Sequence, residues 1–461
     1  MNIRNLIIAS IVACVATAPS QASTPEVTNV TMTQGGSGRL VTITYRLTED
    51  AVVTLDVQTN ATANAATGWA SIGGVAICNA QGAVWRKVTS ADADGNGNYT
   101  ITWRPDLSWL DEFGNGFKIV DGCAKAVVTA WSLDNTPNYM VVDLAAANTV
   151  RYYPGVDFLP GSEIGQKGAV TNNIAYRTSK LLMRKIMALG VEWTMGSANG
   201  ETQRNATTET AHAVTLTNNY YIGVFQVTQA QWKNIATNST AVSEFKVEGD
   251  MRPMERVSYN EIRNAVNTTT ANTSYNWPAA PNPSSFLGLL RTKTGVDFDL
   301  PSETQWEFAA RAGHGSGYWN DGSAIKNSDS DSNLNKLGRY GEDNPGGWNV
   351  TSSLGPSAGG TANTGSYAPS DWGLYDMHGN IWEWCLDWYV DDITSYNGRL
   401  NIDPAAPANT LSGTAGQNRA LRGGSWLNHS GACRPADRSY ADSALRNFNI
   451  GFRLACTGGL R

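Results

Sequence analysis

Apolar and polar residues alternate along the first third of the chain. Five segments between residues 39 and 145 have this strand-like pattern: RLVTITYRL, AVVTLDVQT, NYTITWRP, KAVVTAWSLD and YMVVDLA. A period of two places apolar side chains on one face of a β-strand, and turn-forming runs such as DEFGNG (111–116) separate the segments. Short alternating strands at this spacing predict an all-β sandwich of immunoglobulin or fibronectin type over residues 24–148.

One turn in this region has the beginning of a calcium-binding loop. It reads DADGNGN at residues 92–98. The twelfth position counted from Asp92 is Trp103, where an EF-hand needs a glutamate. We therefore expect a hairpin turn here.

The pattern changes after a connector at residues 149–182, which is rich in Pro and Gly. Short helices are expected to begin at Thr228, Ser258 and Ser302, because Gln or Glu follows each of them three residues later. In this capping box each side chain accepts a hydrogen bond from the other residue's backbone N–H. A fourth helix, SSFLGLLRTKTG, should stop at Gly295, and Gly-, Asn- and Ser-rich loops fill the intervals. Residues 183–456 are thus predicted to form an irregular α+β domain.

Length and charge narrow the class of protein. A chain of 461 residues exceeds one ordinary hydrophobic core, which agrees with two domains. The net charge is −6 and no run of basic residues occurs. Since phosphate binding needs clustered Lys and Arg, we expect no nucleic-acid partner.

The N-terminus predicts export. Arg4 precedes a largely apolar stretch from Leu6 to Ala18, and a small-x-small site predicts cleavage after Ala22, so residues 1–22 are assigned as a signal peptide. An alternative interpretation takes residues 11–14 as a lipobox, with a lipid anchor on Cys14. No later segment is long and apolar enough to form a transmembrane helix. We expect a protein that is secreted, periplasmic or attached to the cell surface.

An exported protein is expected to have its cysteines in disulfides. Disulfides persist in oxidising compartments, and cleavage would leave five cysteines. Cys78 and Cys123 both lie in the first region and are expected to pair. Five is an odd number, so at least one thiol is left over or pairs outside the chain.

Six motifs of the second region follow one another in a recognisable order. They are TMGS (194–197), FQVTQAQW (225–232), LPSETQWEFAARAG (300–313), WGLYDMHGNIWEW (372–384), RALRGGSW (419–426) and NIGFRLA (449–455). Together they resemble the formylglycine-generating enzymes of the sulfatase-modifying factor family, whose domain is similar to the C-type lectin fold. The resemblance covers residues 183–456 and implies that fold here.

The resemblance also implies a structural calcium ion at the GN-x-WEW motif. Calcium takes oxygen ligands and accepts carboxylates together with backbone carbonyls from a tight turn. Carried over position by position, the ligands are the Asp376 carboxylate, the Gly379 and Ile381 carbonyls and the Glu383 carboxylate. The alternative is a structural turn whose acidic side chains are solvated or capped.

The catalytic positions of the family match only in part. The enzymes oxidise cysteine in Cys-x-Pro-x-Arg peptides with copper held by two cysteine thiolates, a ligand that suits Cu(I). The first thiolate position, three residues after Ser425, is Asn428 in this chain. Counted forward from Ser425, the second is Cys433, and His429 matches the family's histidine. Counted backward from ADRS (436–439), the loop is about three residues shorter than in the active enzymes, and Cys433 then lies off the catalytic position.

These departures leave several interpretations open. Cys433 could be a lone copper ligand or nucleophile, or it could form a disulfide with Cys385, with Cys456 left over or as the alternative partner. Ser425 and His429 could form a hydrolytic pair, although no acidic residue is evident to orient the histidine. Hydrogen bonding within the loop is the plainer interpretation.

Two hypotheses of function follow from the resemblance. The first is a copper- and O₂-dependent oxidase that converts peptide cysteine to formylglycine. The second, which Asn428 favours, is a catalytically silent module that binds a protein, peptide or glycan ligand through its Trp-rich, loop-rich domain.

Overall fold

The fold is described from a computed structural model. It covers residues 24–35, 39–146, 150–161, 169–237, 239, 241–246, 249–263, 280–326, 331–341, 360–392 and 418–457. The predicted signal peptide, with Cys14, lies outside the described residues.

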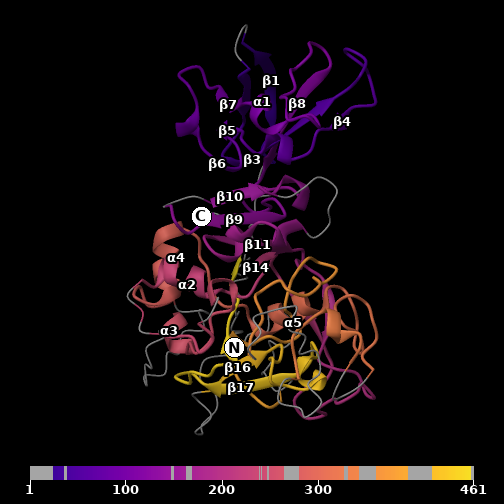
Figure 1. The fold of residues 1–461 in the computed structure, drawn as a ribbon, viewed down its shortest axis with the longest axis vertical. Coiled ribbons are helices and arrows are strands. Elements are labelled where there is room, and N and C mark those ends of the chain that lie inside the picture. The colour runs from indigo at the N-terminus through magenta and orange to yellow at the C-terminus, as the bar shows by residue number, and fades with distance from the viewer. Residues whose placement is uncertain are drawn as a thin grey trace, which may run out of the picture.

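The N-terminal region consists of two packed β-sheets, drawn in indigo and purple in Figure 1. The first sheet has the order β1 (Val27–Gln34), β2 (Val41–Leu47), β7 (Tyr99–Trp103) and β5 (Gln81–Gly82). In the second, β3 (Ala51–Thr59) pairs with β8 (Ala124–Trp131), β6 (Arg86–Val88) and β4 (Ala70–Ser71). Apart from α1 (Pro105–Ser108) and short 3₁₀ turns this region is all β, as the alternating pattern predicts. The finer assignment to an immunoglobulin or fibronectin type stays a prediction.

The run at residues 92–98 forms a turn closed by its own residues. The Asp94 carboxylate accepts hydrogen bonds from the backbone N–H groups of Asn96 and Asn98, at 2.9 and 2.8 Å. The second turn, at Asp111, has the same arrangement, with Phe113 and Asn115 as donors. These carboxylates cap turns, as expected from the failure of the EF-hand pattern.

A five-stranded sheet joins the two regions. Its order is β10 (Val150–Tyr153), β9 (Tyr139–Asp143), β11 (Lys180–Ile186), β14 (Tyr220–Gly223) and β19 (Ala455–Thr457). Strand β9 is the segment YMVVDLA, which the sequence pattern placed in the sandwich. It pairs instead with β10 and β11, because alternation identifies a strand but carries no information about its partner.

The remainder of the C-terminal region is α+β with long loops. Its helices are α2 (Gln229–Ile235), α3 (Tyr259–Arg263), α4 (Phe286–Thr294) and α5 (Glu303–Arg311). Its other strands form a β12 (Glu192–Met195)–β13 (His212–Thr215) pair and a sheet ordered β17 (Arg438–Asp442), β16 (Asn418–Arg422), β15 (Trp382–Trp388), β18 (Ile450–Gly451). Short 3₁₀ helices are η1 (Val75–Ile77), η2 (Ser90–Asp92), η3 (Val156–Phe158), η4 (Ala169–Thr171), η5 (Ile174–Arg177), η6 (Gly249–Met251), η7 (Leu334–Lys336) and η9 (Ser430–Cys433).

The helix boundaries follow the capping signals. The capping boxes at Thr228, Ser258 and Ser302 are all present. Helix α4 ends at Gly295, which has the left-handed conformation with φ +69°. Among the described residues, no helix has the length and apolar character needed to cross a membrane.

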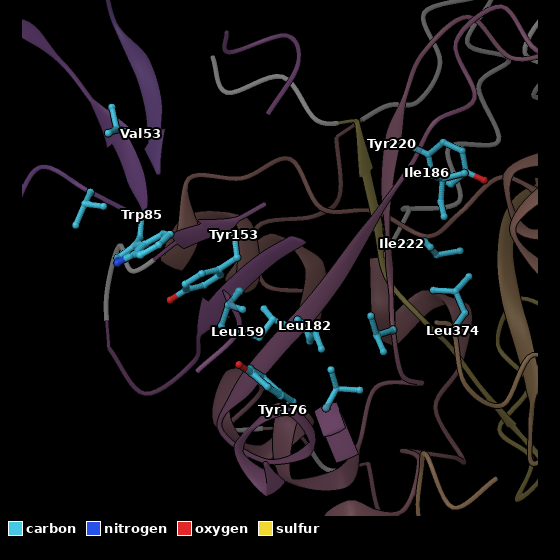
Figure 2. Close-up of a cluster of buried hydrophobic side chains, with 14 of the residues drawn as sticks. Val53, Trp85, Tyr153, Leu159, Tyr176, Leu182, Ile186, Tyr220, Ile222 and Leu374 are labelled. Carbon is cyan, nitrogen blue, oxygen red and sulfur yellow. The ribbon is translucent and has the colours of Figure 1, made fainter. Parts of the chain in front are cut away.

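The sandwich and the C-terminal region share one hydrophobic core (Figure 2). The Trp85 ring, from the sandwich, stacks on Tyr153 of β10 with ring centroids 5.2 Å apart. The backbone N–H of Tyr152 donates to the Trp85 carbonyl at 2.7 Å. Beyond Tyr153 the core continues through Leu182 to Leu374 in the motif loop. The sandwich is therefore packed firmly against the five-stranded sheet.

Candidate functional site

The GN-x-WEW turn gathers three of the four predicted calcium ligands around one side chain, with the Asp376 backbone carbonyl in place of the predicted Asp376 carboxylate. The amide nitrogen Nε2 of Gln226 lies 2.9 Å from Glu383 Oε1. It also lies 3.3 Å from the Asp376 carbonyl and 3.4 Å from each of the Gly379 and Ile381 carbonyls. We call these four oxygens the oxygen cage. Gln226 comes from the FQVTQAQW motif, about 150 residues earlier in the chain, and nothing in that motif indicated its role.

Glycine is required at the centre of this turn. Gly379 has φ +121°, a conformation that L side chains rarely adopt, and a Cβ there would lie 2.2 Å from the Arg339 carbonyl. The close approach of two backbone segments therefore sets the position of the Gly379 carbonyl in the oxygen cage.

The Glu383 carboxylate is fully buried and accepts four hydrogen bonds. Arg453 donates to both of its oxygens at 2.6 and 2.7 Å, and the indole of Trp306 donates at 2.7 Å. The fourth donor is Gln226. This carboxylate links the strand β15, the helix α5 and the C-terminal NIGFRLA motif.

Asp376 contributes its backbone carbonyl to the oxygen cage, while only one of its two carboxylate oxygens accepts a hydrogen bond. Oδ2 accepts from the Gly365 N–H at 2.7 Å, and Oδ1 is buried without a hydrogen-bond partner among the described residues. Burial raises the pKa of Asp376 to about 6.

The oxygen cage has the ligand chemistry of a calcium site, but its centre is filled. Calcium needs its oxygens at about 2.3–2.6 Å, from a point that no other atom occupies. The Gln226 amide nitrogen lies at the point on which the four oxygens converge. In this arrangement the residues do not fit the ion, and calcium here stays a prediction.

In the GGS segment the Ser425 hydroxyl is engaged with Asn428. It donates to Asn428 Oδ1 at 2.5 Å and accepts from Asn449 at 3.3 Å. His429 is exposed and lies at the N-terminus of η9. Because the hydroxyl hydrogen of Ser425 points to Asn428, this geometry supports hydrogen bonding within the loop and offers no base for a Ser–His mechanism.

Cys433 lies in an apolar environment. It is fully buried in a cluster with Trp319, Leu334, Leu337 and Tyr340. Burial raises the pKa of its thiol well above the ordinary value, so the thiolate that copper needs is disfavoured. With Asn428 at the position where the resemblance implies the first thiolate, these residues do not fit a two-thiolate copper site.

The backbone carbonyl of Cys433 contacts His378 of the WGLYDMHGNIWEW motif. The His378 Nδ1 atom lies 3.0 Å from the Cys433 carbonyl, and burial lowers the pKa of this histidine to about 4. At neutral pH His378 is therefore an uncharged part of the core.

The expected disulfides are absent: all five described cysteines are free thiols. Cys78 is exposed, whereas Cys385, Cys433 and Cys456 are buried in three different hydrophobic clusters. The expected pairs Cys78–Cys123 and Cys385–Cys433 rested on shared regions of sequence. Two cysteines in the same region of the sequence need not lie close together in the fold, whereas a disulfide requires that their side chains meet.

Buried arginines brace the loops around the site. Arg422 pairs with Glu303 and Glu307, and Arg438 pairs with Glu303. Arg434 pairs with Glu209 at 2.7 Å. Burial alone would raise the pKa of Glu303, but Arg438 and Arg422 hold it below its ordinary value. The Glu303 and Glu307 carboxylates are thus charged and form a fixed ionic framework with Arg422 and Arg438.

An aromatic patch lies beside Asn428. It consists of Phe245, Trp426 and Phe448, with the Trp426 ring 5.5 Å from that of Phe245 and 5.9 Å from that of Phe448. Phe448 is 39% exposed. The Trp426 indole nitrogen and the Asn449 Oδ1 atom are buried without partners among the described residues.

Comparisons with known proteins identify relatives of the C-terminal region. Residues 175–457 match the family described as "Sulfatase-modifying factor enzyme 1-like domain". The formylglycine-generating enzyme of Streptomyces coelicolor is 36% identical over 171 residues, which cover 34% of this chain and 46% of that relative. The formylglycine-generating enzyme of Mus musculus is 23% identical over 287 residues, which cover 57% of this chain and 72% of that relative. The chain thus spans less than half of the Streptomyces relative.

Two solved structures are similar over much of the chain. PvdO from Pseudomonas aeruginosa matches with a TM-score of 0.44 and 23% identity, covering 60% of this chain and 94% of that one. Treponema denticola variable protein 1 matches with a TM-score of 0.42 and 22% identity, covering 60% and 95%. Since the family match extends over more than half of the sequence, this chain belongs to the sulfatase-modifying factor family, and residues 175–457 are its family domain.

Proposed function

We propose that this protein is a catalytically diverged member of the family that binds a polypeptide or glycan ligand at the surface beside Asn428. One observation carries the proposal: the thiolate pair is incomplete. Asn428 stands at the first position and bonds to Ser425, and Cys433 at the second is buried among apolar side chains. An amide cannot replace a thiolate as a ligand for Cu(I).

The aromatic patch supplies a binding surface of the right chemistry. Phe448 is partly exposed, and Trp426 beneath it has a buried N–H without a partner among the described residues. A buried donor without a partner costs about 1–3 kcal/mol, so a ligand oxygen that reached it would recover that energy. Aromatic faces with nearby polar atoms suit both peptide side chains and sugar rings.

The competing function is the oxidase, and one assay separates the two. Purified protein is incubated with Cu(I), O₂ and a Cys-x-Pro-x-Arg peptide, and the peptide mass is followed. We expect no change of mass. A loss of mass that corresponds to aldehyde formation would overturn the proposal.

Binding is tested on arrays of peptides and glycans, with the wild-type protein and with Phe448→Ala. The variant removes a partly exposed ring from the aromatic patch, so it should weaken binding several-fold with only a small fall in Tm. Phe113→Ala is the matched control, because Phe113 is 80% exposed on the sandwich, away from the patch. Equal loss of binding in both variants would exclude the aromatic patch as the binding surface.

A further inference from the structure

The orientation of the Gln226 amide is determined by a chain of hydrogen bonds. The backbone N–H of Ala362 can only donate, and it donates to Asn380 Oδ1 at 2.8 Å. The Nδ2 of Asn380 therefore faces Gln226 and donates to its Oε1 at 2.9 Å. Because Oε1 is engaged there, Nε2 is the end of the Gln226 amide that faces the oxygen cage.

The number of oxygens around this nitrogen exceeds what an amide requires. An NH₂ group carries two hydrogens, whereas Gln226 Nε2 has four oxygens within 3.4 Å. Three of them are backbone carbonyls from one tight turn and the fourth is a carboxylate. Such a convergence is typical of an oxygen site for a hard cation.

The single carboxylate of the oxygen cage is already paired with a guanidinium. Glu383 supplies its only carboxylate, and Arg453 donates to both oxygens of that carboxylate. Arg453 is fully buried, so a calcium ion at the centre would add two positive charges beside a guanidinium shielded from water. Charge repulsion in a region of low polarity is costly.

We propose that the Gln226 amide takes the place of a cation in the oxygen cage, so that the GN-x-WEW turn of this protein is stable without calcium. The amide donates two hydrogens into the oxygen cage and cross-links the FQVTQAQW and GN-x-WEW motifs. This inference is independent of the proposed binding function, because it concerns the turn and not the aromatic patch.

The proposal predicts that changing Gln226 creates a calcium response. Gln226→Glu replaces the donor with a second carboxylate, which would repel Glu383 and favour a cation. Gln226→Ala removes the amide and leaves four oxygens around an open space. Gln229→Ala is the matched control, because Gln229 is also buried and its side-chain amide donates to the Phe245 carbonyl, outside the oxygen cage.

The test measures Tm in EGTA and in millimolar CaCl₂, together with the calcium content of the protein after gel filtration. We expect the wild type and Gln229→Ala to have the same Tm in both conditions and to retain no calcium. Gln226→Glu and Gln226→Ala should have a lower Tm in EGTA and recover part of it in CaCl₂. If Gln226→Glu folds only with calcium, that result also supports the proposal.

Two outcomes would overturn the proposal. One is a wild-type protein that retains about one calcium per chain and loses Tm in EGTA, which would show that the ion displaces the amide. The other is the absence of any calcium response in both Gln226 variants while Gln226→Ala remains folded, which would show that the oxygens do not form a cation-shaped site.

Discussion

Replacing Glu383 by glutamine tests whether the buried Glu383–Arg453 pair holds the motif turn together. The substitution keeps the shape of the side chain but removes the charge and turns one acceptor into a donor. Every donor now bound to Glu383, from Arg453, Trp306 and Gln226, would then compete for a single acceptor oxygen.

The magnitude follows from the complete burial of both partners. Glu383 and Arg453 have side-chain exposures of 1% and 0%, so the variant leaves a guanidinium without a counter-charge and away from water. Breaking a buried pair in this way costs about 3–5 kcal/mol, which for a unit of the size of the family domain or the whole chain corresponds to a fall in Tm of about 3–8 °C. The pair as a whole need not stabilise the fold, so Arg453→Met combined with Glu383→Met should cost less than the sum of the two single changes.

The assay is urea unfolding followed by circular dichroism, with the exposed pair Lys233–Asp250 as control. Their side chains are 66% and 70% exposed, so Asp250→Asn should change the free energy of unfolding by less than about 1 kcal/mol. If Glu383→Gln had as small an effect as the control, the argument that the turn depends on this buried carboxylate would be refuted.

Three further predictions concern other parts of the molecule. Burial raises the pKa of Asp437 from 3.8 to about 7, so the stability that comes from its protonated carboxyl is complete below pH 3.8 and is lost as the pH rises through 7. Asp437→Asn should therefore make Tm fall less between pH 4 and pH 7. A pH profile of Tm that is the same in the variant and the wild type would contradict this prediction. Trp85→Ala should lower the free energy of unfolding by about 3–5 kcal/mol, because it leaves a cavity in the core between the sandwich and the five-stranded sheet. Calorimetric unfolding of this variant should then show two transitions. Trp69 is half-buried, and Trp69→Ala should not divide the transition. In the native protein a thiol reagent should modify Cys78 first and Cys123 more slowly, and the three buried thiols should react only in guanidinium; any thiol missing from the denatured count would indicate a disulfide.

Much of the local structure was predictable from the order of residues. The capping boxes at Thr228, Ser258 and Ser302 depend on side chains three positions apart, so each helix start could be read directly. The alternating strands of the sandwich were predictable because burial on one face imposes a period of two. The Gly379 and Ile381 carbonyls and the Glu383 carboxylate lie together as the motifs predict, whereas Asp376 contributes its backbone carbonyl instead of its carboxylate.

Other features could not be predicted because they depend on contacts between distant segments. The assignment of β9 to the five-stranded sheet required its partner β11, about forty residues away, and alternation is the same whichever sheet a strand joins. The absence of disulfides required the knowledge that Cys385, Cys433 and Cys456 lie in separate clusters.

The sequence by itself indicated the family and the helix starts, and its resemblance to the family predicts a catalytic thiolate at the position that Asn428 occupies. Only the tertiary structure decided what fills the oxygen cage and how Asn428 and Cys433 are engaged. The physical reason is that the Gln226 amide reaches the turn across about 150 residues of chain. A motif specifies which oxygens a turn presents, and the folded chain decides which atom they surround.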